Sequence, residues 1–298
     1  MIYFVVGVSL LLGSSSSVLA QGLQINGPEC GIPTRGMIVN GSFAGPNQFP
    51  WMVYLDLLAN DGAGYFCAGS ILTRRHILTA AHCTEVEGEP VVKIDAYYGN
   101  PDRTRGRMLR VTKMIRHPRY ERWTLYSDIA ILVVEKPFQY GSNARPLCIP
   151  VAPMNILGTE TILAGWGRLI EGGNSTKHLQ YTTVKVVPNE KCMDQYLWRY
   201  YSDVMYCAYR SGTDSCKGDS GGPAIIRVKG GRYVQVGIVS YGHGCARDEV
   251  PGVYARVDVF TPWIKHVVST SVKAYTSEVP LQPPSYTVLQ WPFIFQFP

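Results

Sequence analysis

Several features that would assign a protein to a class at once are missing from this sequence. It has no dense run of lysine or arginine, so despite a net charge of +6 we do not expect it to bind nucleic acid. None of its apolar runs reaches the roughly 20 residues of a membrane-spanning helix. No internal repeat is evident, and no long helical periodicity occurs before residues 259–270. With 46% hydrophobic residues, the 298-residue chain can still build a sizeable core, in one large β domain or two smaller ones.

The first twenty residues indicate export. An apolar run is followed by small residues that end at Ala20, which predicts a secretory signal peptide over residues 1–20. The positive charge that usually precedes such a run is absent, and the alternative is a membrane anchor. Because the run is short for a span, we expect its removal and a secreted, extracellular protein without a membrane partner. Residues 21–37 contain Gly and Pro without periodicity, which predicts a pro-segment.

Eight cysteines follow the predicted signal peptide. An even count in a secreted chain predicts four disulfides, although spacing alone does not give the pairing. A zinc site at Cys67, His82 and Cys83 is the alternative, disfavoured because no close C-x-x-C pair exists. Glu85, Glu87 and Glu89 form no convincing calcium-binding loop. We therefore expect no metal and no cofactor.

Short apolar segments dominate the middle of the chain. Each is rich in β-branched or aromatic residues and bounded by turn signals. The predicted strands are 49–58, 91–98, 129–134, 161–164, 181–187, 224–228 and 233–240. Many short strands without alternating helices predict an all-β sandwich or pair of barrels, with a helix over 259–270. Residues 271–298 are proline-interrupted, and we expect a disordered tail whose apolar end could instead dock on the domain or a partner.

Three polar residues in separate segments suggest nucleophilic catalysis. Ser220 lies in DSCKGDSGGP, where glycines permit a tight turn and close approach of a substrate. A serine hydroxyl needs a base, and His82 in LTAAHC has small neighbours that leave it room to face a cleft. Asp128 in SDIAIL heads an apolar strand, and a buried carboxylate there needs a partner such as His82. The alternatives are a Gly-rich surface turn and a strand-edge aspartate. The remaining histidines are interpreted as structural or exposed: His76, His117, His178, His243 and His266.

The ordered motifs TAAHC, SDIAIL and GDSGGP resemble the trypsin/chymotrypsin family of serine endopeptidases. The segments IVNG, AGWG, SYGHGC and PGVYARV also match that family, and the resemblance covers about residues 30–270. It implies an all-β fold of two packed six-stranded antiparallel β-barrels, with the cleft between them and a C-terminal helix. The protease domain is expected over residues 38–270.

The resemblance assigns a role to each matching residue. Ser220 corresponds to the nucleophile, His82 to the general base and acid, and Asp128 to the carboxylate that orients the imidazole. The N–H groups of Gly218 and Ser220 correspond to the oxyanion hole. Ser240 matches a serine that supports the aspartate and begins the strand to which the substrate backbone pairs.

Substrate preference follows from the residue six positions before Ser220. The family places the floor of its primary pocket there, and a secluded carboxylate on Asp214 favours a long cationic side chain. Ser215 adds a hydrogen-bond partner, and Gly242 and Gly252 match pocket walls that lack side chains. We expect cleavage after Arg or Lys in protein or peptide substrates.

Activation in the family frees an ammonium, here that of Ile38, which pairs with the aspartate before the nucleophile, here Asp219. The chain departs from the pattern because Met37, not Arg or Lys, precedes Ile38. Either an activator with chymotrypsin- or elastase-like preference cuts after Met37, or a tryptic cut after Arg35 is followed by removal of the dipeptide 36–37. The expected partners are substrates, an activating protease and a protein inhibitor, and we expect a monomer.

The resemblance also implies the disulfides Cys67–Cys83, Cys192–Cys207, Cys216–Cys245 and Cys30–Cys148, the last holding a cut pro-segment. A further bridge of many relatives would need cysteines at Thr161 and Ile226, and both are absent. Asn174 heads a glycosylation sequon in a Gly-rich loop, and the sequon at Asn40 is less favoured because it adjoins the activation site.

These observations predict a secreted, trypsin-like serine endopeptidase made as a zymogen. The alternative is a catalytically silent homologue that acts as a binding or cofactor protein. Such homologues usually have a broken triad, whereas this chain keeps all three residues, and only the unusual activation site favours the alternative. Asp214 disfavours chymotrypsin- or elastase-like specificity.

Overall fold

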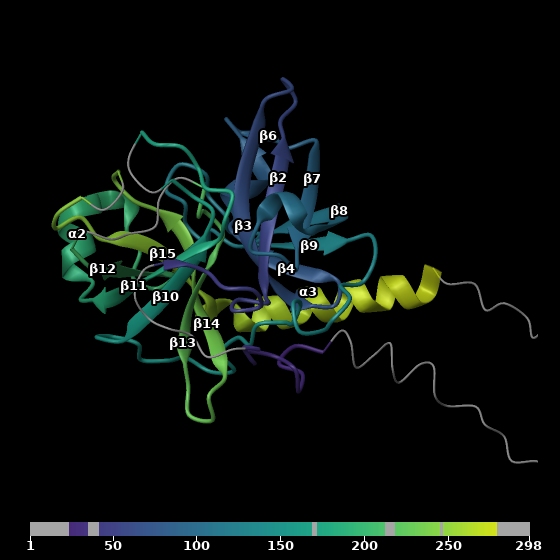
Figure 1. Cartoon of the computed structure of the whole chain (residues 1–298). Coiled ribbons are helices and arrows are strands. Elements are labelled where there is room, and N and C mark those ends of the chain that lie inside the picture. Colours follow the sequence, from purple (N-terminus) through teal and green to yellow (C-terminus); the bar gives the residue numbers. More distant parts are fainter. Residues whose placement is uncertain (1–23, 35–41, 169–171, 212–217, 245–246, 279–298) are drawn as a thin grey trace, which may run out of the picture.

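The computed structural model describes residues 24–34, 42–168, 172–211, 218–244 and 247–278 (Figure 1). The predicted signal peptide, the activation site at Ile38 and the end of the predicted tail lie outside these ranges. So do Asp214, Ser215, Cys216 and Cys245.

The first half of the chain forms a closed antiparallel barrel. Its strand order is β2-β3-β4-β9-β8-β7. The strands are β2 (Met52–Leu58), β3 (Gly64–Thr73), β4 (His76–Thr79), β7 (Lys93–Tyr98), β8 (Arg107–Arg116) and β9 (Ala130–Val134). A two-stranded hairpin of β5 (Glu85–Val86) and β6 (Glu89–Pro90) projects from it. Short 3-10 helices η1 (Ala81–Thr84) and η2 (Arg103–Arg105) lie in its connections.

The second half forms another ring of six strands. The order β11-β10-β13-β14-β15-β12 is closed by pairing of β12 with β11, and β1 (Ser42–Phe43) adds to the edge at β11. The strands are β10 (Glu160–Gly165), β11 (Gln180–Val187), β12 (Met205–Tyr209), β13 (Pro223–Arg227), β14 (Tyr233–Tyr241) and β15 (Gly252–Arg256). The two barrels stand side by side in Figure 1. The predicted pair of six-stranded antiparallel barrels is therefore confirmed.

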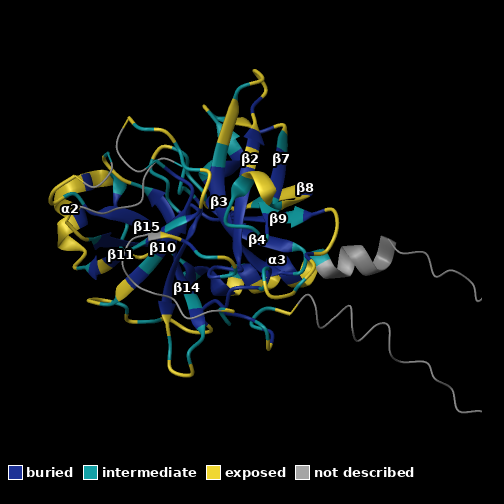
Figure 2. Ribbon diagram, viewed as in Figure 1, coloured by how far each residue is buried: buried dark blue, intermediate teal, exposed yellow. Residues whose placement is uncertain are grey.

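Burial explains only part of the match between predicted and observed strands, because the mostly buried β3, β4, β12 and β15 were not predicted either. In β9 nearly every residue is buried, and Figure 2 shows buried residues filling both barrels. Strand β8 was not predicted, because most of its residues are exposed and a bulge between Val111 and Lys113 interrupts its alternation. Its exposed face carries arginine and lysine, so it lacks the apolar signal of a core strand.

The C-terminal helix α3 (Val257–Glu278) begins close to the prediction and continues past it. The expectation that disorder begins at residue 271 was wrong for residues 271–278, which are helical. Ser271 connects this helix to the first barrel, because its Oγ lies 2.7 Å from Nε2 of the buried His76. A shorter helix, α2 (Glu190–Tyr196), and the 3-10 turn η3 (Leu197–Arg199) were not predicted. No described helix combines the length and apolarity needed to cross a membrane.

Three of the four expected disulfides join described residues: Cys30–Cys148, Cys67–Cys83 and Cys192–Cys207. The fourth expected pair, Cys216–Cys245, lies outside them. Residues 24–34 are also held by hydrogen bonds. The Asn26 side chain accepts from the Ile149 N–H and donates to the Ile149 carbonyl, and Arg232 donates to the Cys30 carbonyl.

Candidate active site

His82 is placed by the turn that follows β4. It lies in η1, where its neighbours Ala80 and Ala81 are fully buried and small enough to leave space for the imidazole. Its Nδ1 lies 2.8 Å from Oδ2 of Asp128, and its backbone N–H donates to Oδ1 of the same carboxylate at 2.9 Å. These two contacts fix both the position and the ring orientation of His82, and neither of them uses Nε2.

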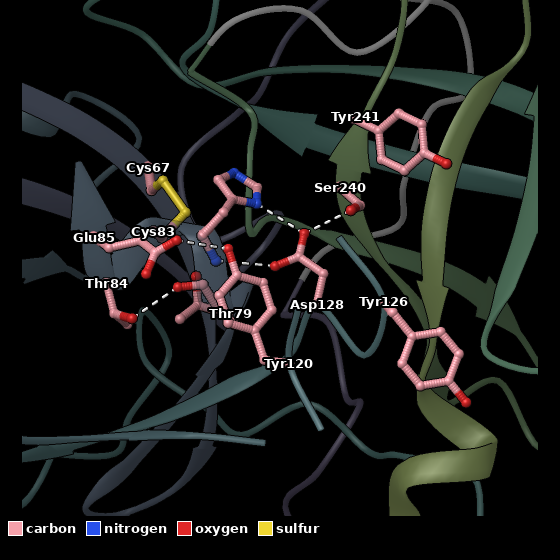
Figure 3. Close-up of polar contacts among 12 residues, drawn as sticks. Cys67, Thr79, Cys83, Thr84, Glu85, Tyr120, Tyr126, Asp128, Ser240 and Tyr241 are labelled. Atoms are coloured by element: carbon pink, nitrogen blue, oxygen red, sulfur yellow. Dashed lines mark hydrogen bonds and ion pairs between the residues drawn. A yellow bond between two sulfur atoms is a disulfide. The ribbon is translucent and has the colours of Figure 1, made fainter. Parts of the chain in front are cut away.

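Asp128 precedes β9 at the boundary between the barrels. Its side chain has no exposure, yet both oxygens are hydrogen bonded. Ser240, in β14 of the second barrel, adds a donor to Oδ2 at 2.5 Å (Figure 3). Burial alone would raise the pKa of Asp128, but the His82 charge and the three donors lower it below its ordinary value. The carboxylate is therefore ionised and anchored across the seam between the barrels.

The same pair shifts the imidazole in the opposite direction. Burial acts to lower the pKa of His82, but the charge and hydrogen bond of Asp128 outweigh it, with a smaller contribution from Glu85, so the pKa is raised. Glu85 is itself held by Arg116 at 2.6 Å. It also accepts a hydrogen bond from the Tyr120 hydroxyl at 3.0 Å (Figure 3). Sequence reasoning considered Glu85 only as a calcium ligand. Its contact with Tyr120 joins β5 to a loop 35 residues further along the chain, which no motif signals.

The Ser220 segment is held between the two barrels. The Ser220 carbonyl accepts from the Ala68 N–H at 2.8 Å, and the Gly221 N–H donates to the Val239 carbonyl at 2.9 Å. Gly221 has φ +77°, and a Cβ there would lie 2.2 Å from the Thr79 hydroxyl, so only glycine fits. Ala68 follows Cys67, and the Cys67–Cys83 bridge adjoins His82. Short connections thus bring the segment of Ser220 to that of His82.

Gly218 also needs to be glycine. Its φ is +103°, and a Cβ would lie 2.2 Å from the Phe66 ring. This conformation turns the backbone tightly just before Ser220, where the N–H groups of Gly218 and Ser220 are expected to receive an oxyanion.

Asp219 lies in a space made by two glycines of the AGWG motif. The Gly167 N–H donates to Asp219 Oδ1 at 2.8 Å. A Cβ on Gly165 would lie 1.9 Å from the same oxygen, and one on Gly167 would lie 2.6 Å from the carboxyl carbon. Sequence reasoning used AGWG as a family motif without giving it this purpose. The Ile38 terminus expected to pair with Asp219 lies outside the described residues.

The two predicted wall glycines face each other. A Cβ on Gly242 would approach the Cα of Gly252 to 3.9 Å, so neither position puts a side chain between them. The predicted floor, Asp214, and its neighbour Ser215 lie outside the described residues. Asn174 is exposed, as a glycosylated residue must be.

The donor cluster considered for zinc does assemble, but it does not suit a metal. The ligand atoms of Cys67, His82 and Cys83 lie within 4.8 Å of one another. Both sulfurs are in a disulfide, however, so neither can provide the thiolate that zinc binds.

The two closed antiparallel barrels, with the His82–Asp128 pair on the first and Ser240 of the second bonded to Asp128, match the architecture expected of a trypsin-like serine protease. Comparison with known proteins agrees with this class. The family model described as Trypsin matches residues 38–264. The chain therefore belongs to the trypsin family of serine proteases.

Curated relatives give the same result. The chain is 38% identical to Trypsin eta of Drosophila erecta, over 77% of this chain and 89% of that protein. It is 35% identical to Transmembrane protease serine 9 of Rattus norvegicus and 33% identical to Serine proteinase stubble of Drosophila melanogaster, in each case over 80% of this chain. It spans only 22% and 32% of the lengths of those two proteins.

Proposed function

We propose that the chain is a secreted endopeptidase, made as a zymogen, that hydrolyses peptide bonds after Arg or Lys. The observation that carries the proposal is the double anchoring of His82 by Asp128, with Ser240 bonded to the same carboxylate. A merely structural histidine does not require a buried carboxylate held by three donors. Family membership and the sequence position of Ser220 support the same reaction.

In this mechanism Ser220 Oγ attacks the carbonyl carbon of the scissile bond while Nε2 of His82 takes its proton. The buried carboxylate of Asp128 stabilises the imidazolium, which then protonates the departing amine. The N–H groups of Gly218 and Ser220 receive the negative oxygen. Water, activated by His82 in the same way, hydrolyses the acyl-enzyme and restores the Ser220 hydroxyl.

The preference for Arg or Lys depends on Asp214. A carboxylate at the closed end of a pocket between Gly242 and Gly252 would form an ion pair with a long cationic side chain of the substrate. An apolar side chain in the same pocket would leave the charge of the carboxylate unpaired. Replacing Asp214 by Ser should reduce cleavage after Arg roughly a hundredfold or more, the loss of a charged hydrogen bond.

The test uses protein whose N-terminus is shown by sequencing to be Ile38. The full chain is treated with chymotrypsin or elastase, and separately with trypsin plus a dipeptidyl peptidase, and the activator is then removed. We expect cleavage of an arginine anilide and a lysine anilide but not a phenylalanine anilide, and loss of activity in Ser220→Ala. An inactive protein that begins at Ile38 would reject the proposal and favour the silent homologue. Full activity with a stable start at Gly36 would reject the activation route.

A further inference from the structure

A cationic side chain without a carboxylate partner lies close to the proposed oxyanion hole. Arg103 belongs to η2, on the first barrel, and is only partly exposed. Its guanidinium carbon lies 4.9 Å from the ring centre of Tyr54 and 5.4 Å from that of Phe66. Stacking of this kind orients a guanidinium and leaves its edges available for hydrogen bonds.

The hydrogen-bond partners of this guanidinium are neutral. One Nη donates to the Tyr54 hydroxyl and the other to the Ser175 hydroxyl at 3.2 Å. Nε is buried without a partner. Among the described residues no carboxylate lies within ion-pair distance of Arg103, although Asp56 is near enough for the Arg103 charge to act on its pKa. A guanidinium has five N–H donors, so the two recorded bonds leave donors unused.

The position of Phe66 connects Arg103 with the reaction. The Phe66 ring covers the face of Gly218 where a Cβ would otherwise stand. Tyr54 stacks on Phe66 at 5.6 Å between ring centres and packs edge-on against the buried Trp166 at 5.7 Å. Arg103 therefore sits on a rigid aromatic support whose Phe66 end touches the proposed oxyanion hole.

The backbone bonds of the Ser220 segment indicate on which side of Ser220 the Arg103 side chain lies. Its segment is bonded to Ala68 in β3 and, through Gly221, to Val239 in β14. Phe66 belongs to β3, whereas Ser240 belongs to β14 and begins the strand proposed to pair with the acyl side of the substrate. Phe66 and Arg103 thus flank Ser220 from the side of the leaving group. An extended substrate advances about 3.3 Å per residue. The path from Gly218 across the Phe66 ring to the Arg103 guanidinium therefore corresponds to about two substrate residues.

We propose that Arg103 is a specificity-determining residue that binds an acidic side chain, Asp or Glu, at the second substrate position after the scissile bond. This inference rests on the proposed function, because it requires cleavage of a peptide at Ser220. The carboxylate supplies the missing anionic partner, and Tyr54 and Ser175 hold the guanidinium in place for it.

The experiment compares quenched fluorescent peptides with a single arginine, identical except for Glu, Gln or Lys at the second position after it. For wild-type protein beginning at Ile38, we expect kcat/KM to be about tenfold higher with Glu than with Gln, and lowest with Lys. Arg103→Met should make the Glu and Gln peptides equal, while Arg103→Lys keeps part of the preference. Arg105→Gln removes a charge from the same 3-10 turn at an exposed position and should keep all of it.

An arginine anilide, which has no residue after the scissile bond, separates the possible failures. Equal anilide activity in wild type and Arg103→Met, with loss of the Glu preference only in the variant, supports the inference. If wild type cleaves the anilide but treats Glu and Gln alike, the inference fails and the proposed function stands. If Arg103→Met lowers anilide and peptide cleavage by the same factor, Arg103 is only a contact between the barrels. If wild type cleaves no substrate, the proposed function fails first.

Discussion

Ser240 donates a hydrogen bond to Oδ2 of Asp128, the same oxygen that lies 2.8 Å from Nδ1 of His82. The donor comes from β14 of the second barrel, while the acceptor and His82 belong to the first. One carboxylate oxygen therefore depends on both barrels for its hydrogen bonds. A change in how the barrels pack would change the environment of the His82 imidazole.

Replacing Ser240 by Ala tests this dependence. The variant leaves Asp128 with the two His82 donors and removes the third, so we expect kcat/KM on an arginine anilide to fall about tenfold, as for loss of a hydrogen bond to a charged group. Ser70→Ala is the matched control, because Ser70 is equally buried and donates to a neutral acceptor, Gln235 Oε1. Equal effects of the two substitutions on kcat/KM would show that Ser240 supports the fold rather than the carboxylate.

Gly165→Ala should separate folding from activity. The added Cβ would fall 1.9 Å from Oδ1 of Asp219 and displace that carboxylate from the Gly167 N–H. If the Ile38 ammonium pairs there, activity should drop roughly tenfold or more, since the displaced carboxylate loses a charged hydrogen bond and its alignment with the ammonium. Gly64→Ala, where a Cβ meets nothing within 4 Å, is the control. The comparison is made by anilide kinetics and thermal melting, and an unimpaired Gly165→Ala enzyme would contradict the role given to Asp219.

His76 should make the fold sensitive to acid. Burial, with a smaller contribution from Arg75, lowers the pKa of His76 to about 4 from 6.5. The folded protein thus binds this proton less readily than the unfolded chain, so stability is full above pH 6.5 and is lost as pH falls toward 4. At about 1.4 kcal/mol per pKa unit, the loss approaches roughly 3 kcal/mol.

The measurement is urea unfolding at pH 7 and pH 4 in a Ser220→Ala background, which prevents self-digestion. His76→Gln should reduce the difference in unfolding free energy between the two pH values, whatever its effect at pH 7. The exposed His266 lies on α3, and His266→Gln controls for loss of a histidine elsewhere. An unchanged pH difference in His76→Gln would show that other groups cause the acid sensitivity.

The sequence predicted the candidate site residues best where they lie in short contiguous motifs. TAAHC and SDIAIL identified His82 and Asp128, and the structure brings them into contact. The barrels followed from the family resemblance more than from periodicity, because the sequence pattern missed both the exposed strand β8 and buried strands such as β3 and β4. The helical continuation to Glu278 was hidden by the composition of the tail.

Contacts between segments that are distant in the chain could not be predicted from the sequence. Nothing in the local sequence of Arg103 indicates that its guanidinium lies over Tyr54 and Phe66, since that depends on how two loops and two strands pack. The space that Gly165 leaves for Asp219 is hidden for the same reason: the two residues are far apart in the chain. Such pairs emerge only from the assembled tertiary structure.

Residues 24–34 are bound to the folded body by a disulfide at Cys30 and by the paired bonds between Asn26 and Ile149. Scission before Ile38 would consequently split the polypeptide into two while changing the mass of the particle only by one water, or by the lost dipeptide 36–37 in the second activation route. The two forms would then co-elute on a sizing column, and electrophoresis would separate the two polypeptides only after denaturation with a thiol reductant.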